Sequence, residues 1–212
     1  MKKLLLYTAG SASREVLLAV QQLNERQPTW EVLGFVDEDP RIIGTEVDGY
    51  PVFGLDHNER GKDVYGICCV MDPKVRKRIV EEQIEGKGLA LASIIHPSVV
   101  IPKDFEAGPG TVIMPSVNIS FDVKLGKGVF VLWNVLLGHN LRAADYVTVL
   151  SSANITGGCS IGDRAIIGAG ATINVNVSIG KDCLIGLGTT VFRNVGDNKS
   201  VVALPRQLVR SR

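Results

Sequence analysis

Aliphatic side chains recur at every sixth position over the C-terminal half of the chain. From residue 95 to residue 191, each sixth residue is isoleucine, leucine or valine, apart from Ala107 and Ala143. Many of these positions are followed directly by glycine, as at Gly138, Gly162 and Gly168. An α-helix has about 3.6 residues per turn and a strand alternates its faces, so neither keeps a period of six. The pattern is therefore an internal repeat.

This repeat predicts a parallel β-helix with three sides. One branched side chain per hexad would point into a narrow prism, and β-branched residues suit its extended backbone. Three hexads would close one triangular coil, and successive coils would pair as parallel strands about 4.8 Å apart. The repeat is long enough for roughly five to six coils. Cys159 and Cys183 fall four residues after a repeat position, where small side chains dominate, so we expect them in the core.

The first ninety residues instead alternate short apolar runs with helical periodicity. Buried strands are predicted over residues 4–7, 32–36, 64–71 and 89–94. Helices are predicted after Ser13, a candidate N-cap, and after Asp72, which is followed by Pro73 at the first helical position. Alternating strands and helices predict a small parallel sheet with helices on its faces, a Rossmann-like α/β domain.

The predicted organisation is this α/β domain over residues 1–92, a β-helix over 93–198 and a tail over 199–212. In open α/β sheets, ligands bind beyond the carboxyl ends of the strands. The loop after the first strand lacks the Gly-x-Gly-x-x-Gly fingerprint of dinucleotide sites. Its small residues would still let a ligand approach N–H groups at the helix start. A nucleotide-type ligand and mere tight packing both fit this loop.

Charge and cysteine usage narrow the function classes. Lys and Arg total 23 against 22 Asp and Glu, a net charge of +1, which gives no support to nucleic-acid or anionic-membrane binding. No apolar run approaches the roughly 20 residues that span a bilayer. The start of the chain is too briefly apolar for a signal peptide and fits a buried strand better. The four cysteines form no C-x-x-C pair, which favours a reducing cytosol and no structural metal.

A small α/β domain followed by Ile-Gly-x-x-x-x hexads resembles the bacterial sugar acyltransferases of the hexapeptide-repeat superfamily. The nearest group includes sialic acid O-acetyltransferase and the N-acetyltransferases of nucleotide-linked 4-amino sugars. The resemblance covers nearly the whole chain, including the bridging segment Ile94-Ile95-His96-Pro97-Ser98. It implies a left-handed parallel β-helix, a cytoplasmic homotrimer and a role in making cell-surface polysaccharide. It also implies that acetyl-CoA lies between neighbouring prisms.

The resemblance places the general base at His139, in the segment Leu137-Gly138-His139-Asn140. A neutral imidazole in an outward turn can take a proton from an amine or a hydroxyl. An ordinary exposed turn histidine is the alternative. The family usually has Asp or Glu after this His, whereas Asn140 can orient an imidazole but carries no charge. Asp122, eighteen residues before Asn140 and so one coil earlier on the same edge, would be able to replace that carboxylate.

The same resemblance implies contacts between acetyl-CoA and Thr148, the backbone at Gly157 and Ala169, and Arg206. Gly157 lies eighteen residues beyond His139, one coil further on the same edge, which would put the thioester beside the base. For Arg206, in the basic tail, a merely solubilising C-terminus is the alternative.

The nucleotide sugar would bind the α/β domain. The residues that the resemblance assigns to this substrate are Gly10, Ser11, Ala12, Asp37, Glu38 and Met71. The acidic pair would hold the base or the ribose. Ser11-Ala12 replaces the Gly-His common in the family, so a contact from that histidine is missing. Met71 replaces a glycine and would narrow the acceptor pocket.

The sequence therefore predicts an acetyl-CoA-dependent N-acetyltransferase that acts on the amino group of a nucleotide-linked 4-amino-deoxy sugar. Transfer would be direct, with His139 as base and without a metal. O-acetylation of a sugar hydroxyl, as in the sialic acid enzyme, is one alternative. A catalytically weak or silent binding trimer is another, favoured by Asn140 and Ala12. A gamma-type carbonic anhydrase needs three histidine ligands, and His139 is the only histidine after the bridging segment.

Overall fold

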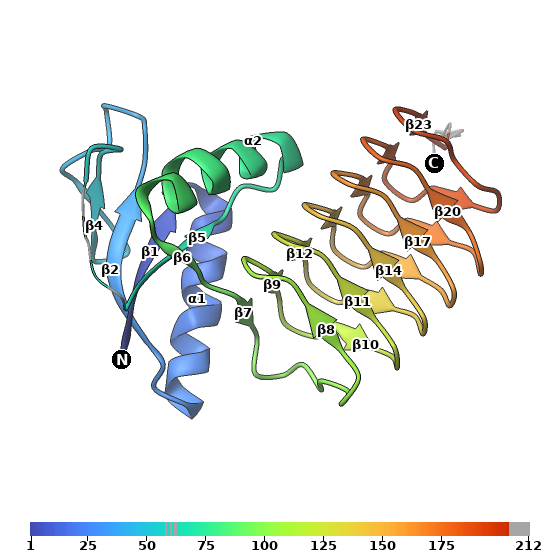
Figure 1. Ribbon diagram of the computed structural model, residues 1–212, viewed down its shortest axis with the longest axis horizontal. Helices are drawn as coiled ribbons and strands as arrows, with labels where there is room; N and C mark the ends of the chain where they lie inside the picture. Colours follow the sequence, from blue (N-terminus) through green and yellow to red (C-terminus); the bar gives the residue numbers. More distant parts are fainter. Residues whose placement is uncertain (58, 60, 62, 204–212) are drawn as a thin grey trace, which may run out of the picture.

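A computed structural model describes residues 1–57, 59, 61 and 63–203, and it contains two domains of different architecture (Figure 1). An α/β domain forms the N-terminal end. A stack of triangular coils extends away from it and ends with a strand at Ser200–Val201 (Figure 1). No helix in the described ranges is both long and apolar enough to cross a bilayer.

The α/β domain contains one sheet of six strands in the order β3-β4-β2-β1-β5-β6. Its strands are β1 (Lys2–Tyr7), β2 (Trp30–Val36), β3 (Glu46–Val47), β4 (Tyr50–Phe53), β5 (Val64–Cys68) and β6 (Ala90–Leu91). Every pairing is parallel except that of β3 with β4. The hairpin of β3 and β4 was not predicted, because its strands are too short to show a hydrophobic pattern.

Helices cover both faces of this sheet. α1 (Ser11–Arg26) packs on one face, and on the other lies a continuous helical segment of α2 (Pro73–Arg78), a π-helical turn η1 (Ile79–Ile84) and a 3₁₀ turn η2 (Glu85–Lys87). Asp72 caps α2 as predicted, since its side chain accepts the N–H groups of Lys74 and Val75. The prediction of Ser13 as N-cap was wrong. Gly10 holds that position, and Ser13 is buried with its hydroxyl paired to that of Thr8.

The β-helix consists of three parallel sheets, one for each side of the coil. Sheet I contains β7 (Ile94–Ile95), β9 (Val112–Ile113), β12 (Phe130–Val131), β15 (Thr148–Val149), β18 (Ile166–Ile167), β21 (Leu184–Ile185) and β23 (Ser200–Val201). Sheet II contains β8 (Glu106–Ala107), β11 (Lys124–Leu125), β14 (Arg142–Ala143), β17 (Ser160–Ile161) and β20 (Ser178–Ile179). Sheet III contains β10 (Asn118–Ile119), β13 (Leu136–Leu137), β16 (Asn154–Ile155), β19 (Thr172–Ile173) and β22 (Thr190–Val191).

Paired residues of neighbouring coils are eighteen positions apart, as in Asn118 with Leu136. The last pairing of sheet I is shorter, with Leu184 opposite Ser200. The sheet therefore continues to β23, inside the segment predicted as the tail.

The six-residue repeat forms the core of the prism, as predicted, because most of its aliphatic residues are buried in one continuous cluster. Cys159 and Cys183 are buried in the same cluster. The exceptions lie in the first coils. Ile101 is 50% exposed because it lies in the bridging region before β8, where no strand forms the third side of the coil.

The two domains are joined by an apolar interface and a buried arginine. Outward side chains of sheet I, among them Val112 and Phe130, pack into the same cluster as α1. Arg76 of α2 is only 1% exposed, and it donates to the carbonyl oxygens of Gly128 and Tyr146 at 2.8 and 2.7 Å. It also donates to the carbonyl of Val70 in its own domain. The α/β domain therefore covers the first strands of sheet I, up to β15, and leaves sheets II and III uncovered.

Candidate active site

His139 lies in the turn between β13 and β14, at the corner where sheets III and II meet. Its side chain is exposed. The next residue, Asn140, has φ of 57°, a left-handed conformation that asparagine tolerates better than most residues. The turn itself thus favours Asn, Asp or Gly at position 140, and Asp122 occupies the equivalent place one coil earlier with φ of 52°.

The imidazole of His139 is held between two neighbouring coils. The ring of Phe121 stacks on it, with centroids 5.1 Å apart and planes 9° from parallel. On the other side lies Gly157, where a Cβ atom would clash with the Nε2 atom of His139. Glycine at 157 therefore leaves the space that the ring occupies. Because these three residues are eighteen positions apart, the coil period alone stacks them.

A chain of hydrogen bonds leads away from the other ring nitrogen. His139 Nδ1 lies 2.8 Å from Asn140 Oδ1, and Asn140 Nδ2 donates to Asp122 Oδ2 at 2.7 Å. Arg142 donates to the same carboxylate oxygen at 2.6 Å. The hydrogen bonds from Arg142 and from Asn140 hold the pKa of Asp122 below its usual value. Asp122 thus contacts the imidazole only through the Asn140 amide.

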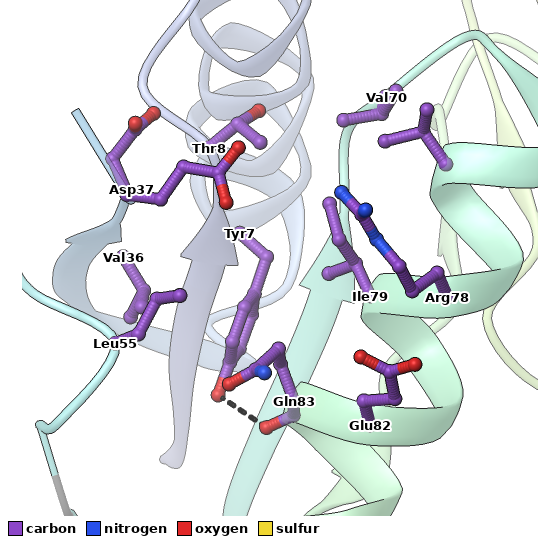
Figure 2. A pocket seen from close by; sticks show the side chains of 12 residues that line it. Tyr7, Thr8, Val36, Asp37, Leu55, Val70, Arg78, Ile79, Glu82 and Gln83 are labelled. Atoms are coloured by element: carbon purple, nitrogen blue, oxygen red, sulfur yellow. Dashed lines mark hydrogen bonds between the residues drawn. The ribbon is translucent and has the colours of Figure 1, made fainter.

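A second polar site lies at the carboxyl ends of β1 and β2, in a pocket of about 280 Å³. Figure 2 shows Asp37 and Thr8 on one side of this pocket and Arg78 and Glu82, from the helical segment, on the other. Tyr7 forms part of the wall and donates its hydroxyl to the carbonyl of Gln83 at 3.1 Å. Burial raises the pKa of Tyr7 to about 12, so it remains a neutral phenol.

Only some of the predicted substrate residues lie in this pocket. Asp37 and Glu38 line it, and both carboxylate oxygens of Asp37 accept backbone N–H groups, from Ala9 at 2.8 Å and from Asp39 at 2.9 Å. The remaining predicted substrate residues are not among its lining side chains: Gly10, Ser11 and Ala12 are at the start of α1, and Met71 precedes α2.

Sequence reasoning missed Thr8, Arg78 and Glu82 as pocket residues. Thr8 has φ of 81°, which is strained for a β-branched side chain, and no sequence signal reveals it. Arg78 and Glu82 are four residues apart and share a helix face with Val75 and Ile79, which also line the pocket. That spacing, on a helix following the third predicted strand, is a signal that was available in the sequence.

The structure argues against the predicted contact between Thr148 and acetyl-CoA. Thr148 is 1% exposed, beneath the α/β domain on sheet I. Its hydroxyl donates to the Met71 carbonyl at 2.7 Å and accepts from Arg76 at 2.9 Å. Both Thr148 and the Met71 backbone therefore belong to the domain interface. The reason is positional, because outward residues on this part of sheet I pack against the other domain rather than at the corner of His139.

The other predicted cofactor residues lie at two corners of the prism. Gly157 is at the His139 corner, whereas Ala169 is in the turn between β18 and β19, where sheets I and III meet. Within the described residues, neither backbone N–H donates to an acceptor of the chain. Arg206 lies outside the described residues. No group of three His, Cys, Asp or Glu side chains in the described part of the chain could hold a metal ion.

Comparisons with known proteins agree with this architecture. Residues 3–83 match the family model described as the PglD N-terminal domain. A histidine variant of GDP-perosamine N-acetyltransferase from Caulobacter crescentus, solved with CoA and GDP-perosamine, is 23% identical with a TM-score of 0.87, over 100% of this chain and 98% of that one. No curated protein matches the sequence.

Two further solved structures are similar over almost their whole length. The acetyltransferase domain of PglB from Neisseria gonorrhoeae, in complex with acetyl coenzyme A, is 24% identical with a TM-score of 0.83 and covers 94% of this chain and 95% of its own. WeeI from Acinetobacter baumannii is 22% identical with a TM-score of 0.83, over 96% of this chain and 97% of that one.

These likenesses confirm the predicted fold class, an α/β domain followed by a left-handed parallel β-helix. The match of residues 3–83 to the PglD N-terminal domain model agrees with the predicted resemblance to the bacterial hexapeptide-repeat sugar acyltransferases, and the solved structures share the fold.

Proposed function

We propose that this protein is an N-acetyltransferase that moves the acetyl group of acetyl-CoA to the amino group of a nucleotide-linked 4-amino-deoxy sugar. The observation that carries the proposal is His139, an exposed imidazole whose Nδ1 is held by Asn140 while Nε2 faces the next coil. Further support comes from the fold shared with an N-acetyltransferase solved with CoA and a nucleotide-linked amino sugar.

In the proposed reaction, the sugar amine attacks the thioester carbonyl carbon, and His139 Nε2 takes the proton that the amine loses. The carbon–sulfur bond breaks as the amide forms. The sulfur of CoA leaves with the bonding electrons and receives the proton from the imidazolium, which regenerates the neutral base. The Gly157 N–H, which donates to no acceptor within the described residues, would stabilise the negative charge on the carbonyl oxygen.

The nucleotide part of the substrate would occupy the pocket of the α/β domain. Arg78 supplies a positive charge for the phosphates, and Asp37 and Glu38 supply acceptors for ribose or base. The exposed start of α1, at Gly10 and Ser11, adds N–H groups near the same edge of the sheet that donate to no backbone acceptor in the part of the chain that the structure describes. The aliphatic walls of the pocket, from Val36 to Ile79, suit a flat base.

The proposal requires more than one copy of the chain. The pocket belongs to the domain that covers sheet I, whereas His139 projects from the corner between sheets II and III. An acceptor in the pocket of one copy would therefore meet the imidazole of a neighbouring copy. We propose a cytoplasmic homotrimer, with acetyl-CoA between adjacent prisms along the Gly157 and Ala169 corners, and Arg206 remains a candidate for the CoA phosphates.

The test is the rate of CoA release with a panel of acceptors: nucleotide-linked 4-amino sugars carrying different bases, their 4-hydroxy analogues, and sialic acid. We expect turnover of an amino sugar, and a fall in kcat of about 10²–10⁴-fold for His139→Ala. Lys103→Ala is the matched control, because Lys103 is an exposed residue at the same turn position two coils earlier. Equal rates for wild type and His139→Ala would remove the imidazole from the mechanism, and turnover of hydroxyl acceptors alone would replace N-acetylation by O-acetylation.

A further inference from the structure

The amide of Asn140 stands between an imidazole and a carboxylate, and its two ends differ chemically. The amide oxygen only accepts hydrogen bonds and the amide nitrogen only donates them. The way the amide faces therefore decides which ring nitrogen of His139 carries the proton in the neutral state.

The surrounding charges fix that direction. Asp122 Oδ2 accepts a hydrogen bond from Arg142 at 2.6 Å. Because a guanidinium only donates hydrogen bonds, this oxygen must be an unprotonated acceptor. The Asn140 atom 2.7 Å from the same oxygen must then be the nitrogen. The amide oxygen is left facing the imidazole at 2.8 Å, and it can only accept, so Nδ1 of His139 must carry a hydrogen.

We propose that Asp122 is a positioning residue that acts through Asn140 to keep neutral His139 in the tautomer with hydrogen on Nδ1 and a free lone pair on Nε2. The inference rests on the proposed function for its kinetic consequence, but not for the tautomer itself. In this arrangement a neutral amide orients the imidazole, whereas a carboxylate next to the histidine would do so by direct contact. Since the ring contacts no charged group within the described residues, the carboxylate orients the base through the amide without forming an ion pair with it.

The geometry also explains why Nε2 is the productive atom. Nε2 lies over Gly157, in the space that a Cβ atom there would need, and Phe121 covers the opposite face of the ring. Rotation of the ring about its Cβ–Cγ bond would break the bond to Asn140 and is opposed by the packing of Phe121 and Gly157 against the ring. The proton acceptor thus faces Gly157, one coil further along the corner.

The tautomer can be measured without any substrate, by long-range proton–nitrogen NMR of the histidine rings, with His139 identified by its loss in His139→Gln. The chain has three histidines, so the spectrum is simple. We expect neutral His139 to carry its hydrogen on Nδ1. In Asp122→Gly the hydrogen should shift to Nε2, the form that free imidazole side chains prefer in water. Position 122 has φ of 52°, so glycine adds no backbone strain.

Matched variants separate this role from a merely structural one. Asn134→Gly removes a side chain at the same kind of turn, with φ of 56°, at a different corner, and should leave the His139 tautomer unchanged. Asp122→Asn should also keep it, because Arg142 still demands an oxygen at that place. Asn140→Gly should lose it in the same way as Asp122→Gly, and serves as the second variant if Asp122→Gly fails to fold. A wild-type His139 protonated on Nε2, or glycine variants at 122 and 140 with an unchanged tautomer, would overturn the proposal.

The kinetic arm uses the acceptor that wild type turns over best. For Asp122→Gly we expect kcat to fall by at least about tenfold, below the full contribution of a general base, with KM for both substrates nearly unchanged. Asp122→Asn should retain most of the wild-type kcat. A shifted tautomer with undiminished kcat would show that Asp122 does not serve the reaction. If no acceptor is turned over by wild type, the proposed function fails, while the NMR result still decides the tautomer.

Discussion

The β-helix and the α/β domain bring distant residues together in different ways. In the β-helix, residues on neighbouring coils are eighteen positions apart. Phe121, His139 and Gly157 therefore lie one above another because of their spacing in the sequence. In the α/β domain the contacts follow no period: Asp37 holds the Ala9 N–H, and Arg76 reaches Tyr146 in the other domain. In a repeat, the sequence alone therefore predicts which residues meet at a corner. The residues that line a pocket between loops and helices can be identified only from the folded structure.

The largest expected effect concerns the contact that joins the two architectures. Arg76→Met should lower the free energy of unfolding by about 3–5 kcal/mol, because several buried carbonyl oxygens lose a charged donor. Arg41→Met is the control, since Arg41 is exposed and, among the described residues, pairs only with Asp39 two positions away. Urea unfolding followed by circular dichroism measures both. A loss below about 1 kcal/mol for Arg76→Met would mean that the apolar interface alone joins the domains.

The next prediction compares two isoleucines at the same place in the repeat. Ile155 is fully buried, and Ile155→Ala should cost about 2–4 kcal/mol through lost packing and the resulting cavity. Ile101→Ala removes the same atoms from a half-exposed site and should cost less than about 1 kcal/mol. Thermal and urea unfolding of the two variants test whether burial or repeat position sets the cost. Equal losses of unfolding free energy in the two variants would contradict the partial exposure of Ile101 in the first coil.

The smallest effect is a pH dependence that separates a contact between coils from a local one. Arg164 bonds to both carboxylate oxygens of Asp182, one coil away, at 2.9 and 2.7 Å, and lowers the pKa of Asp182. Arg41 lowers the pKa of Asp39 to about 2, yet this pair is two residues apart and accessible to water. The unfolded chain can keep the Asp39 pair, so we expect little stability from it despite its lower pKa.

The sign follows from the depressed pKa of Asp182 in the folded protein. Its contribution is present above the unfolded pKa of about 4 and disappears as pH falls through the lower folded value. Asp182→Asn should therefore be less stable than wild type at pH 7, and the two urea midpoints should converge in acid. Asp39→Asn should differ little from wild type at either pH. A constant gap between Asp182→Asn and wild type from neutral to acid pH would contradict this assignment.

Much of the fold was predictable because buried positions recur at regular intervals in the sequence. The hexads predicted the prism and its core, including the buried Cys159 and Cys183. The spacing of eighteen residues predicted that Asp122 lies on the same edge as Asn140, and the two side chains do form a hydrogen bond. The first coil was less predictable. Ile101 keeps the repeat but lacks a complete set of neighbouring strands, and periodicity reports side-chain direction without reporting whether anything covers it.

The parts that sequence could not supply depend on docking between domains. Nothing in the repeat marks Thr148 as covered by another domain, so a resemblance assigned it to the cofactor. Arg76, one of several charges in its helix, had no signal that separated it from solvent-exposed neighbours. Thr8 carries its strained backbone in an ordinary-looking loop. Each of these residues owes its role to contacts far away in the chain.

The step of eighteen residues between most paired strands also governs how this architecture can change in length. Deleting or duplicating one segment of eighteen residues would remove or add a single storey, about 4.8 Å tall, with every remaining face kept in register. A change of one residue would instead shift the local strand register, and with it the inward side chains, unless a turn or bulge absorbed it. The prism can therefore lengthen or shorten by whole coils, and the separation between the α/β domain and the far end of the prism can evolve in such steps without disturbing the corner that holds His139.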